Sequence, residues 1–263
     1  PLAGERFDGH AYINAALESG AVGCLTQRER ESYQPGKFYV KVPSTQRALR
    51  DLAAWYKEQF HIPFVAVTGS VGKTTAKDML AAVLGVKYKV LKTEGNFNNN
   101  IGLPLTLLRL DSSHQVGVVE MGMDKFGEID YLGGIVKPEV GVITNIGDAH
   151  IENFGERETT LAEKARIFSA AKPGFTAILN GDDELLRTLG PTLEEQGAGR
   201  VLLCGREEGL DYRAGELESD WRSQISCTVT TPGGSHHMDI PGLGEHMIYP
   251  TLMAAAVGEK FGM

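Results

Sequence analysis

The sequence predicts an α/β protein that is built around a doubly wound, mostly parallel sheet. From about residue 62 onward, short apolar runs alternate with stretches whose apolar residues recur at helical spacing. Most of these runs are continuously apolar rather than alternating, which is typical of parallel strands that helices cover on both faces. Because ligands of such sheets bind beyond the carboxyl ends of the strands, the residues that follow each run are the first candidates for a function.

A smaller, partial α/β domain is predicted before this sheet, over residues 1–60. Its first helix carries apolar residues from Tyr12 to Leu17 on one face and ends at Gly20, which can serve as a C-terminal cap. Strands are expected over 21–26 and 38–42, and Ser44 or Thr45 can cap a second helix. The segment His-Ile-Pro over 61–63 ends that helix. We place the domain boundary near residue 60, so that the larger domain covers 61–263.

The larger domain is expected to alternate strands and helices in chain order. The apolar runs predict strands over 63–68, 87–91, 116–121, 140–145, 176–180 and 200–204. Helical patterns lie over 73–84, 103–108, 158–170 and 183–189. The stretch 223–240 is typical of an antiparallel hairpin with its turn at a Pro-Gly-Gly sequence, and a final helix is expected over 251–261.

The composition is that of a globular protein, with 263 residues, 34 acidic and 26 basic side chains and a formal net charge of -8. This balance argues against a general affinity for nucleic acid or anionic membranes, which requires a basic surface. No apolar run is long enough to span a bilayer, and the first residues lack a secretory signal. The three cysteines, Cys24, Cys204 and Cys227, are too widely spaced for a zinc motif or a disulfide framework. We therefore expect a cytoplasmic monomer without stable membrane insertion.

The strongest motif is the stretch FVAVTGSVGKTTAKDML, in which a buried strand enters a glycine-containing turn and then a helix. Glycines let backbone N–H groups surround a phosphate chain, Lys73 can reach the β- and γ-phosphates, and the Thr74 hydroxyl can ligate Mg²⁺. A plain strand-turn-helix corner would explain the glycines, but not Lys-Thr-Thr at the start of the helix. The common pattern has Gly where this chain has Val67. The predicted nucleotide site consists of Thr68, Gly69, Ser70, Val71, Gly72, Lys73, Thr74 and Thr75.

Polar residues close two of the later apolar runs. Glu120 closes the first, where its carboxylate could complete a Mg²⁺ shell or simply lie in a surface loop. Asn145 closes the second, with Asp148 and His150 shortly beyond it on the side of the sheet where ligands bind. A histidine in this position is a candidate ligand or a structural residue.

Two further segments carry polar side chains that could either contact a ligand or have a structural role. Asn180 ends another strand, and the pair Asp182-Asp183 behind it could bind a ligand or cap the next helix. The loop over 93–104, TEGNFNNNIGLP, crowds four asparagines between glycines. Because asparagine tolerates left-handed backbone, the loop could be purely conformational, or it could recognise a polar, sugar- or peptide-like substrate.

Six motifs, taken in order, resemble the Mur ligases of peptidoglycan synthesis: VTGSVGKTT, GNFNNNIGLP, EMG, TNIGDAHIENFG, AEKARIF and LNGDD. The phosphate loop of that family also lacks the first glycine, which accounts for Val67. The asparagine-rich loop resembles the MurF type, which adds D-Ala-D-Ala to UDP-MurNAc-tripeptide, whereas the MurE type usually carries a Thr-Thr-Pro loop there. The opening GERFDGHAYINAALESGA resembles the family's N-terminal domain, which holds the UDP end of the substrate.

The resemblance implies an ATP-dependent ligase that phosphorylates the terminal carboxylate of the UDP-linked peptide and lets an amine attack the acyl phosphate. It implies that Lys73 and the loop amides hold the phosphates, and that Thr74 and Glu120 hold one Mg²⁺. His150 would hold a second metal ion, and Lys164 matches the lysine that carries a carbamate in this family. Substrate contacts are implied for Asn98, Asn99 and Asn145, and nucleotide contacts for Asn180 and Asp182.

This chain departs from the family pattern in two respects. The late helix of the family often has asparagines where this chain has Met247 and Pro250, so adenine recognition is expected to differ. Family members also continue into an acceptor-binding domain, which we expect to be absent here, and the start of the chain resembles the middle of the first domain.

Three other functions are alternatives to a D-Ala-D-Ala-adding ligase. One is a MurE-type ligase, and a second is a non-catalytic nucleotide-binding fragment. A third is a phosphate-loop kinase for a small molecule, because kinases, switches, ATPases and ligases all use such loops. The kinase would leave Lys164 and the asparagine-rich loop without a role. Folylpolyglutamate synthetase is a more distant resemblance, which the opening segment and the asparagine-rich loop disfavour.

Overall fold

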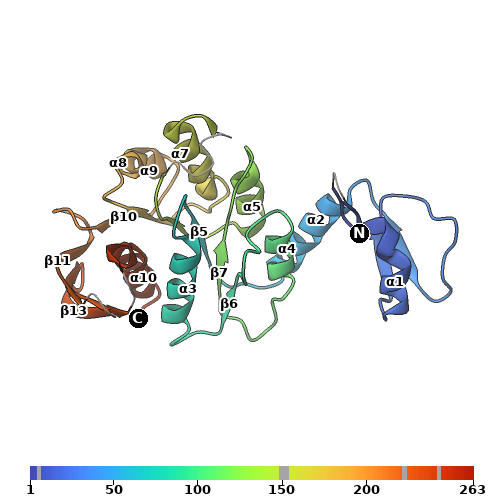
Figure 1. The fold of residues 1–263 in the computed structure, drawn as a ribbon, viewed down its shortest axis with the longest axis horizontal. Helices are drawn as coiled ribbons and strands as arrows, with labels where there is room; N and C mark the ends of the chain where they lie inside the picture. Colours follow the sequence, from blue (N-terminus) through green and yellow to red (C-terminus); the bar gives the residue numbers. More distant parts are fainter. Residues whose placement is uncertain (5–6, 148–153, 221–223, 242–243) are drawn as a thin grey trace.

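The structure is a computed structural model that describes residues 1–4, 7–147, 154–220, 224–241 and 244–263. Figure 1 shows a large α/β body and a small N-terminal lobe, with helix α2 (Thr45–Glu58) between them. Within the described ranges, no helix combines the length and the apolar character needed to cross a membrane.

The N-terminal lobe contains two small strand pairs and one short helix. Ile13 and Leu17 are buried on the predicted apolar face of that helix, and Tyr12 is exposed. Gly20 follows the helix with a φ of 107°, as expected of a residue that ends it. The elements are β1 (Ala3–Gly4) antiparallel to β2 (Phe7–Asp8), the 3₁₀ helix η1 (Gly9–Tyr12), α1 (Ile13–Glu18), and β3 (Gly23–Thr26) parallel to β4 (Phe38–Lys41).

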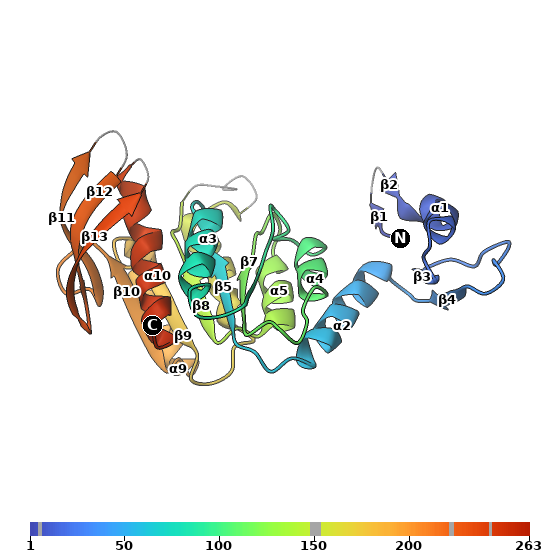
Figure 2. The same cartoon turned by 90° about the horizontal axis from the view of Figure 1, so that it is seen from below.

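Helix α2 joins the lobe to the large body. The Ser44 side chain accepts a hydrogen bond from the Arg47 N–H and caps the helix, as predicted. Ala53 is buried against the large body, and the Tyr56 hydroxyl donates to the Leu110 carbonyl at 2.8 Å. Figure 2 shows α2 beside α4 and α5 of the large body, with the lobe beyond its other end.

The large body is organised around one nine-stranded mixed sheet, in the order β13-β12-β11-β10-β9-β8-β5-β7-β6. Every strand pair from β6 across to β11 is parallel, and β12 pairs antiparallel with both β11 and β13. This confirms the predicted doubly wound, mostly parallel α/β fold. The strands are β5 (Phe64–Thr68), β6 (Val90–Lys92), β7 (Val116–Glu120), β8 (Val140–Ile143), β9 (Thr176–Asn180), β10 (Arg200–Gly205), β11 (Tyr212–Asp220), β12 (Gln224–Thr231) and β13 (Gly234–Pro241).

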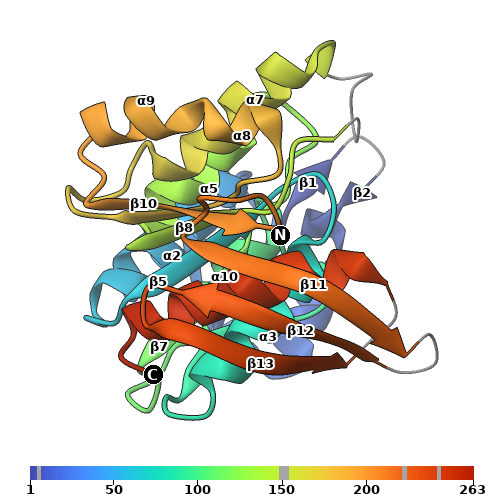
Figure 3. The same ribbon diagram turned by 90° about the vertical axis from the view of Figure 1, so that its left-hand side faces the viewer.

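Helices cover both faces of this sheet, and alternate residues of the buried strands divide between the two resulting cores. In β5, for example, Phe64 and Ala66 face one core while Val65 and Val67 face the other. Figure 3 shows α3 and α10 behind strands β11 to β13, on one side of the sheet. Helices α3 (Lys73–Leu84) and α10 (Ile248–Lys260) cover this side. The other side is covered by α2, α4 (Gly102–Leu107), α5 (Glu128–Val136), α7 (Arg157–Ala165) with η2 (Arg166–Phe168), α8 (Glu184–Arg187) and α9 (Leu189–Glu195).

Several boundaries differ from the predicted ones for local reasons. The strand expected from residue 87 begins at Val90, because the Lys87 and Tyr88 N–H groups bond back to Leu84 at the end of α3. Helix α10 begins at Ile248 after the 3₁₀ turn η3 (Glu245–Met247), with Pro250 in its first turn. A proline is tolerated there because the first N–H groups of a helix have no partner within it.

Candidate functional site

The phosphate loop follows β5 and leads directly into α3, as predicted. Gly69 and Gly72 have φ values of 148° and 82°, which side-chain-bearing residues rarely adopt. A Cβ atom at Gly69 would also collide with the Thr144 hydroxyl oxygen. Both glycines are therefore required by the backbone path, which brings N–H groups and the start of α3 to one point.

Lys73, the first residue of α3, folds back over this loop. Its ammonium donates hydrogen bonds to the carbonyl oxygens of Gly69 at 3.0 Å and Ser70 at 3.2 Å. Burial lowers the pKa of Lys73 from 10.5, and the nearby carboxylates of Glu120 and Asp124 oppose that shift. The loop thus carries a partly desolvated cation at the place where a phosphate chain would lie.

The exit of β8 fixes the other side of the loop. The Asn145 side chain accepts from the Val71 N–H at 2.9 Å and donates to the Val71 carbonyl at 3.1 Å. The Thr144 hydroxyl donates to the same carbonyl, and the Ser70 hydroxyl exchanges hydrogen bonds with the Gly147 backbone. Asn145, predicted as a substrate contact, is here engaged in holding the phosphate loop.

Glu120 connects the phosphate loop to the asparagine-rich loop. Its carboxylate is 1% exposed and accepts from the Thr74 hydroxyl at 2.9 Å and from the Asn98 amide at 2.8 Å. The Glu120 N–H donates to the Thr93 hydroxyl, so the backbone of this strand end is fixed as well. A hydroxyl and a carboxylate that meet in this way are oxygen ligands of the kind that Mg²⁺ shares with nucleotide phosphates and water.

Two other asparagines of the loop, Asn99 and Asn100, have partners elsewhere than Glu120. The Asn99 side chain accepts from the N–H groups of Ile101 and Gly102, where α4 begins. The Asn100 amide donates to Glu128, while its buried carbonyl oxygen has no partner in the described part of the chain. The conformational interpretation of the loop therefore applies to Asn99, and Asn98 alone reaches the phosphate-loop side through Glu120.

A cavity of about 930 Å³ opens beside the phosphate loop. Asn180 and Asp182, the predicted nucleotide contacts, line it together with loop residues Gly72 and Thr75. Asp183 lines it as well, and its carboxylate caps α8 and accepts from the Ile146 N–H. The lining also includes residues that the sequence did not single out, among them Arg157, Leu185, His246 and Tyr249. They lie on separate elements and share no sequence signal.

Lys164 lies buried on α7, with only 2% of its surface exposed. Among the described residues, its ammonium has no hydrogen-bond or ion-pair partner. Burial, together with the positive charge of Lys73, lowers the pKa of Lys164 to about 8. The structure thus brings Lys164 into electrostatic contact with the phosphate-loop lysine. His150 and Asp148 lie outside the described residues.

The low pKa of Lys164 predicts a measurable effect on stability. An ammonium that titrates near 8 in the folded chain and near 10.5 in the unfolded chain destabilises the fold below pH 8, and this cost declines as the pH rises from 8 to 10.5. In CO₂-free buffer, Lys164→Met is therefore expected to raise the free energy of unfolding at pH 7 by roughly 2 to 3 kcal/mol. Thermal melts should show a smaller gain at pH 10. Exposed Lys89→Met is the control, and a Lys164→Met variant that is less stable at pH 7 would contradict a destabilising charge on Lys164.

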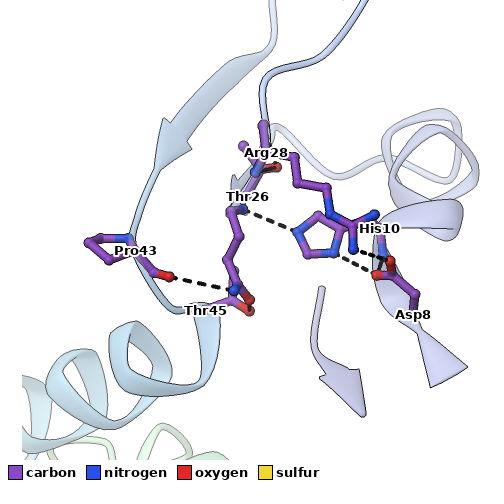
Figure 4. Close-up of polar contacts among 7 residues, drawn as sticks. Asp8, His10, Thr26, Arg28, Pro43 and Thr45 are labelled. Carbon is purple, nitrogen blue, oxygen red and sulfur yellow. Dashed lines mark hydrogen bonds and ion pairs between the residues drawn. The ribbon is translucent and has the colours of Figure 1, made fainter. Parts of the chain in front are cut away.

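The N-terminal lobe contains a second polar cluster, shown in Figure 4. The His10 ring donates from Nδ1 to Asp8 and accepts at Nε2 from the Gln27 N–H at 3.1 Å, and Arg28 pairs with Asp8 at 2.7 Å. The Gln27 side chain in turn accepts from the Thr45 hydroxyl at the start of α2. A cavity of about 280 Å³ beside this cluster is lined by residues that include His10, Arg28 and Arg30. The sequence analysis named none of these residues as a ligand contact, because the resemblance there rests on a whole segment and not on single residues.

No group of three or more His, Cys, Asp or Glu side chains that could hold a metal ion occurs in the described ranges. The Thr74–Glu120 pair is smaller than such a group. It fits an ion that takes most of its ligands from phosphates and water.

Comparisons with known proteins bear on both parts of the chain. A family model described as Mur ligase middle domain matches residues 67–258. The UDP-N-acetylmuramoyl-tripeptide--D-alanyl-D-alanine ligase of Bacillus subtilis (strain 168) is 37% identical over 263 residues, which cover 100% of this chain and 55% of that protein.

Two solved structures are similar over nearly the whole chain. A crystal structure of MurF from Acinetobacter baumannii has a TM-score of 0.91 at 33% identity and covers 100% of this chain and 56% of its own. MurF ligase from Thermotoga maritima, in complex with ADP, has a TM-score of 0.88 at 29% identity, over 99% of this chain and 59% of its own. The chain spans about half the length of the curated relatives it matches.

Proposed function

The chain belongs to the Mur ligase family, and on that premise we propose that it serves ATP-dependent amide bond formation in peptidoglycan precursor synthesis. The reaction adds D-Ala-D-Ala to UDP-MurNAc-tripeptide. A B. subtilis relative of that name and the A. baumannii and T. maritima MurF structures support this choice over the MurE type. The asparagine-rich loop supports it independently. Free cysteines and the use of ATP are consistent with the cytoplasm.

ATP is the proposed phosphoryl donor, bound with its phosphates in the loop over 68–75 and its nucleoside in the 930 Å³ cavity. A carboxylate oxygen of the tripeptide attacks the γ-phosphorus, giving an acyl phosphate and ADP. The D-Ala-D-Ala amine then attacks the acyl carbon, and phosphate leaves as the amide forms. Lys73 and the loop N–H groups neutralise the charge on the transferring phosphoryl group, which is the main requirement of such chemistry.

Mg²⁺ is the proposed metal cofactor, and Thr74 and Glu120 are its proposed protein ligands. When bound, it would offset negative charge on the phosphates. Asn98 fixes the Glu120 carboxylate from the opposite side, so the asparagine-rich loop orients this ligand pair. His150 is proposed to hold a second ion.

Lys164 is proposed to carry a carbamate. Its neutral amine, favoured by the pKa of about 8, would form an N–C bond with CO₂ and release a proton. The product is an anion beside Lys73, so the repulsion between two buried cations becomes an attraction. A carbamate is also an oxygen donor that suits Mg²⁺.

The N-terminal lobe is proposed to bind the UDP end of the substrate. Arg28 and Arg30 line its 280 Å³ cavity and provide cationic donors that suit a diphosphate. Of the three predicted substrate contacts, Asn98, Asn99 and Asn145, Asn98 is the one that we assign to the approach of the peptide.

One observation carries the proposal: the hydrogen-bonded chain Thr74–Glu120–Asn98 links the nucleotide site to the asparagine-rich loop. A simple nucleotide-binding module or a small-molecule kinase has no use for that link. A ligase needs this link, because the loop that contacts the peptide must hold the peptide carboxylate close to the metal ion and the γ-phosphate.

The test is phosphate release by the longest natural polypeptide that contains this sequence. Release is expected only when Mg-ATP, UDP-MurNAc-tripeptide and D-Ala-D-Ala are all present. Turnover with diaminopimelate or lysine and the UDP-dipeptide instead would establish the MurE type. Phosphorylation of a free hydroxyl substrate would establish the kinase, and nucleotide binding without any turnover would establish the non-catalytic fragment. The 263-residue chain alone is expected to bind Mg-ATP and to turn over little.

A further inference from the structure

The cavity beside the phosphate loop is lined in part by residues that the sequence did not single out. Gly72 and Thr75 of the phosphate loop and of α3 contribute to the lining. Helix α10 and the turn before it contribute His246, Tyr249 and Pro250 to the same cavity. Because the proposed phosphate position is at the loop, the rest of this lining is what the cavity offers to the nucleoside.

Asp182, the predicted nucleotide contact, is already engaged by the protein. Its carboxylate accepts from the N–H groups of Arg206 and Glu207 and from the Tyr249 hydroxyl at 3.0 Å. These three donors make four contacts, because the Arg206 N–H reaches both carboxylate oxygens. Both oxygens of Asp182 are thus engaged by the protein, and one of them fixes the Tyr249 hydroxyl.

Tyr249 is held in place by this bond while its side chain stays half-buried in the cavity wall. Burial, with the Asp182 carboxylate, raises the pKa of Tyr249 to about 12, so its hydroxyl remains a donor at neutral pH. The next residue, Pro250, is buried and has no N–H to offer, and Met247 does not line the cavity. On this wall an aromatic ring is the largest surface available to a base.

We propose that Tyr249 is the residue of α10 that binds the nucleoside, with its ring packed against the base and its position set by Asp182. This rests on the proposed binding of ATP in the same cavity. An anchored ring loses little conformational freedom when a base packs on it, and such packing is worth a 5- to 150-fold change in affinity, roughly, on replacement by alanine. Tyr249 would thus provide nucleoside affinity on a helix that lacks amide side chains at positions 247 and 250.

The test compares Mg-ATP with Mg-tripolyphosphate, which has the phosphates but no nucleoside, by calorimetry on the 263-residue chain. Tyr249→Ala is expected to raise the Kd for ATP about 10-fold or more and to leave the Kd for tripolyphosphate within about 2-fold. Tyr249→Phe keeps the ring and loses one hydrogen bond, so it should retain most of the ATP affinity. Tyr33→Ala, in the N-terminal lobe, is the control for removal of an exposed tyrosine.

Each outcome separates this inference from the proposed function. Equal ATP affinity for wild type and Tyr249→Ala overturns the inference, and so does an equal loss for both ligands, which means that the variant distorts the phosphate loop. If the wild type binds ATP no tighter than tripolyphosphate, the nucleoside contributes nothing and the inference fails while the phosphate loop stands. If the wild type binds neither ligand, the proposed function itself fails.

Discussion

Lys73→Ala is expected to reduce turnover by a factor of about 1,000 and to weaken Mg-ATP binding beyond detection in the 263-residue chain. The Lys73 ammonium lies over the phosphate loop, where it is partly desolvated beside the carbonyls of Gly69 and Ser70. A positioned charge in a water-poor site interacts more strongly than one in bulk water, and loss of one such donor typically costs 100- to 1,000-fold in rate, roughly.

The loss of ATP binding is expected only when Lys73 is replaced, and not when another lysine is removed. Exposed Lys89→Ala is the matched control and should bind ATP as the wild type does. Lys73→Arg keeps the positive charge but replaces the compact ammonium by a guanidinium. We expect its ATP affinity to lie between those of the wild type and Lys73→Ala. Calorimetry that gives equal ATP affinity for wild type and Lys73→Ala would refute the phosphate-loop assignment, whatever the substrates of the enzyme are.

The local part of this site could be predicted from the sequence, because it depends on contiguous residues. Strand β5, the turn with Gly69 and Gly72, and a helix that starts at Lys73 all lie where the motif requires them. The sheet could be predicted for the same reason, since its central strands are continuous apolar runs. Strand β11 was missed, because YRAGELESD has neither an apolar run nor a strict alternation and is held by pairing with β10 and β12.

The long-range part of the site could not be predicted, because it depends on which side chains meet across the sheet. Asn145 has the residue type of a substrate contact, yet its partner is the backbone of Val71, 74 positions earlier. Tyr249 lies 67 positions from Asp182, and nothing in either local sequence indicates the pair. Asn99 was also predicted as a ligand contact, but its side chain accepts hydrogen bonds from the N–H groups two and three residues ahead. Polar residue types identify candidates, and only the tertiary fold assigns their partners.

Glu120→Gln is expected to lower turnover by about 100- to 1,000-fold and to raise the Mg²⁺ concentration that gives half-maximal activity. The substitution preserves the size of the side chain, so it changes mainly the charge beside Thr74. The glutamine amide can still meet the Thr74 hydroxyl, and its carbonyl can still accept from Asn98, so the fold around this 1%-exposed position is retained. What is lost is an anionic oxygen, which a hard cation such as Mg²⁺ binds far more strongly than a neutral one.

A Mg²⁺ titration of turnover separates this role from a structural one. If Glu120 is a metal ligand, raising Mg²⁺ should restore part of the activity of Glu120→Gln, and Thr74→Val should show a smaller shift in the same direction. Glu195→Gln, on the exposed face of α9, is the control and should titrate as the wild type does. If Glu120 only braces the two loops, Glu120→Gln should keep the wild-type Mg²⁺ midpoint, because both hydrogen bonds are retained. Asn98→Ala, which removes one of those bonds, should then lose thermal stability with an unchanged Mg²⁺ midpoint, whereas a metal role predicts a shifted Mg²⁺ midpoint for Asn98→Ala as well.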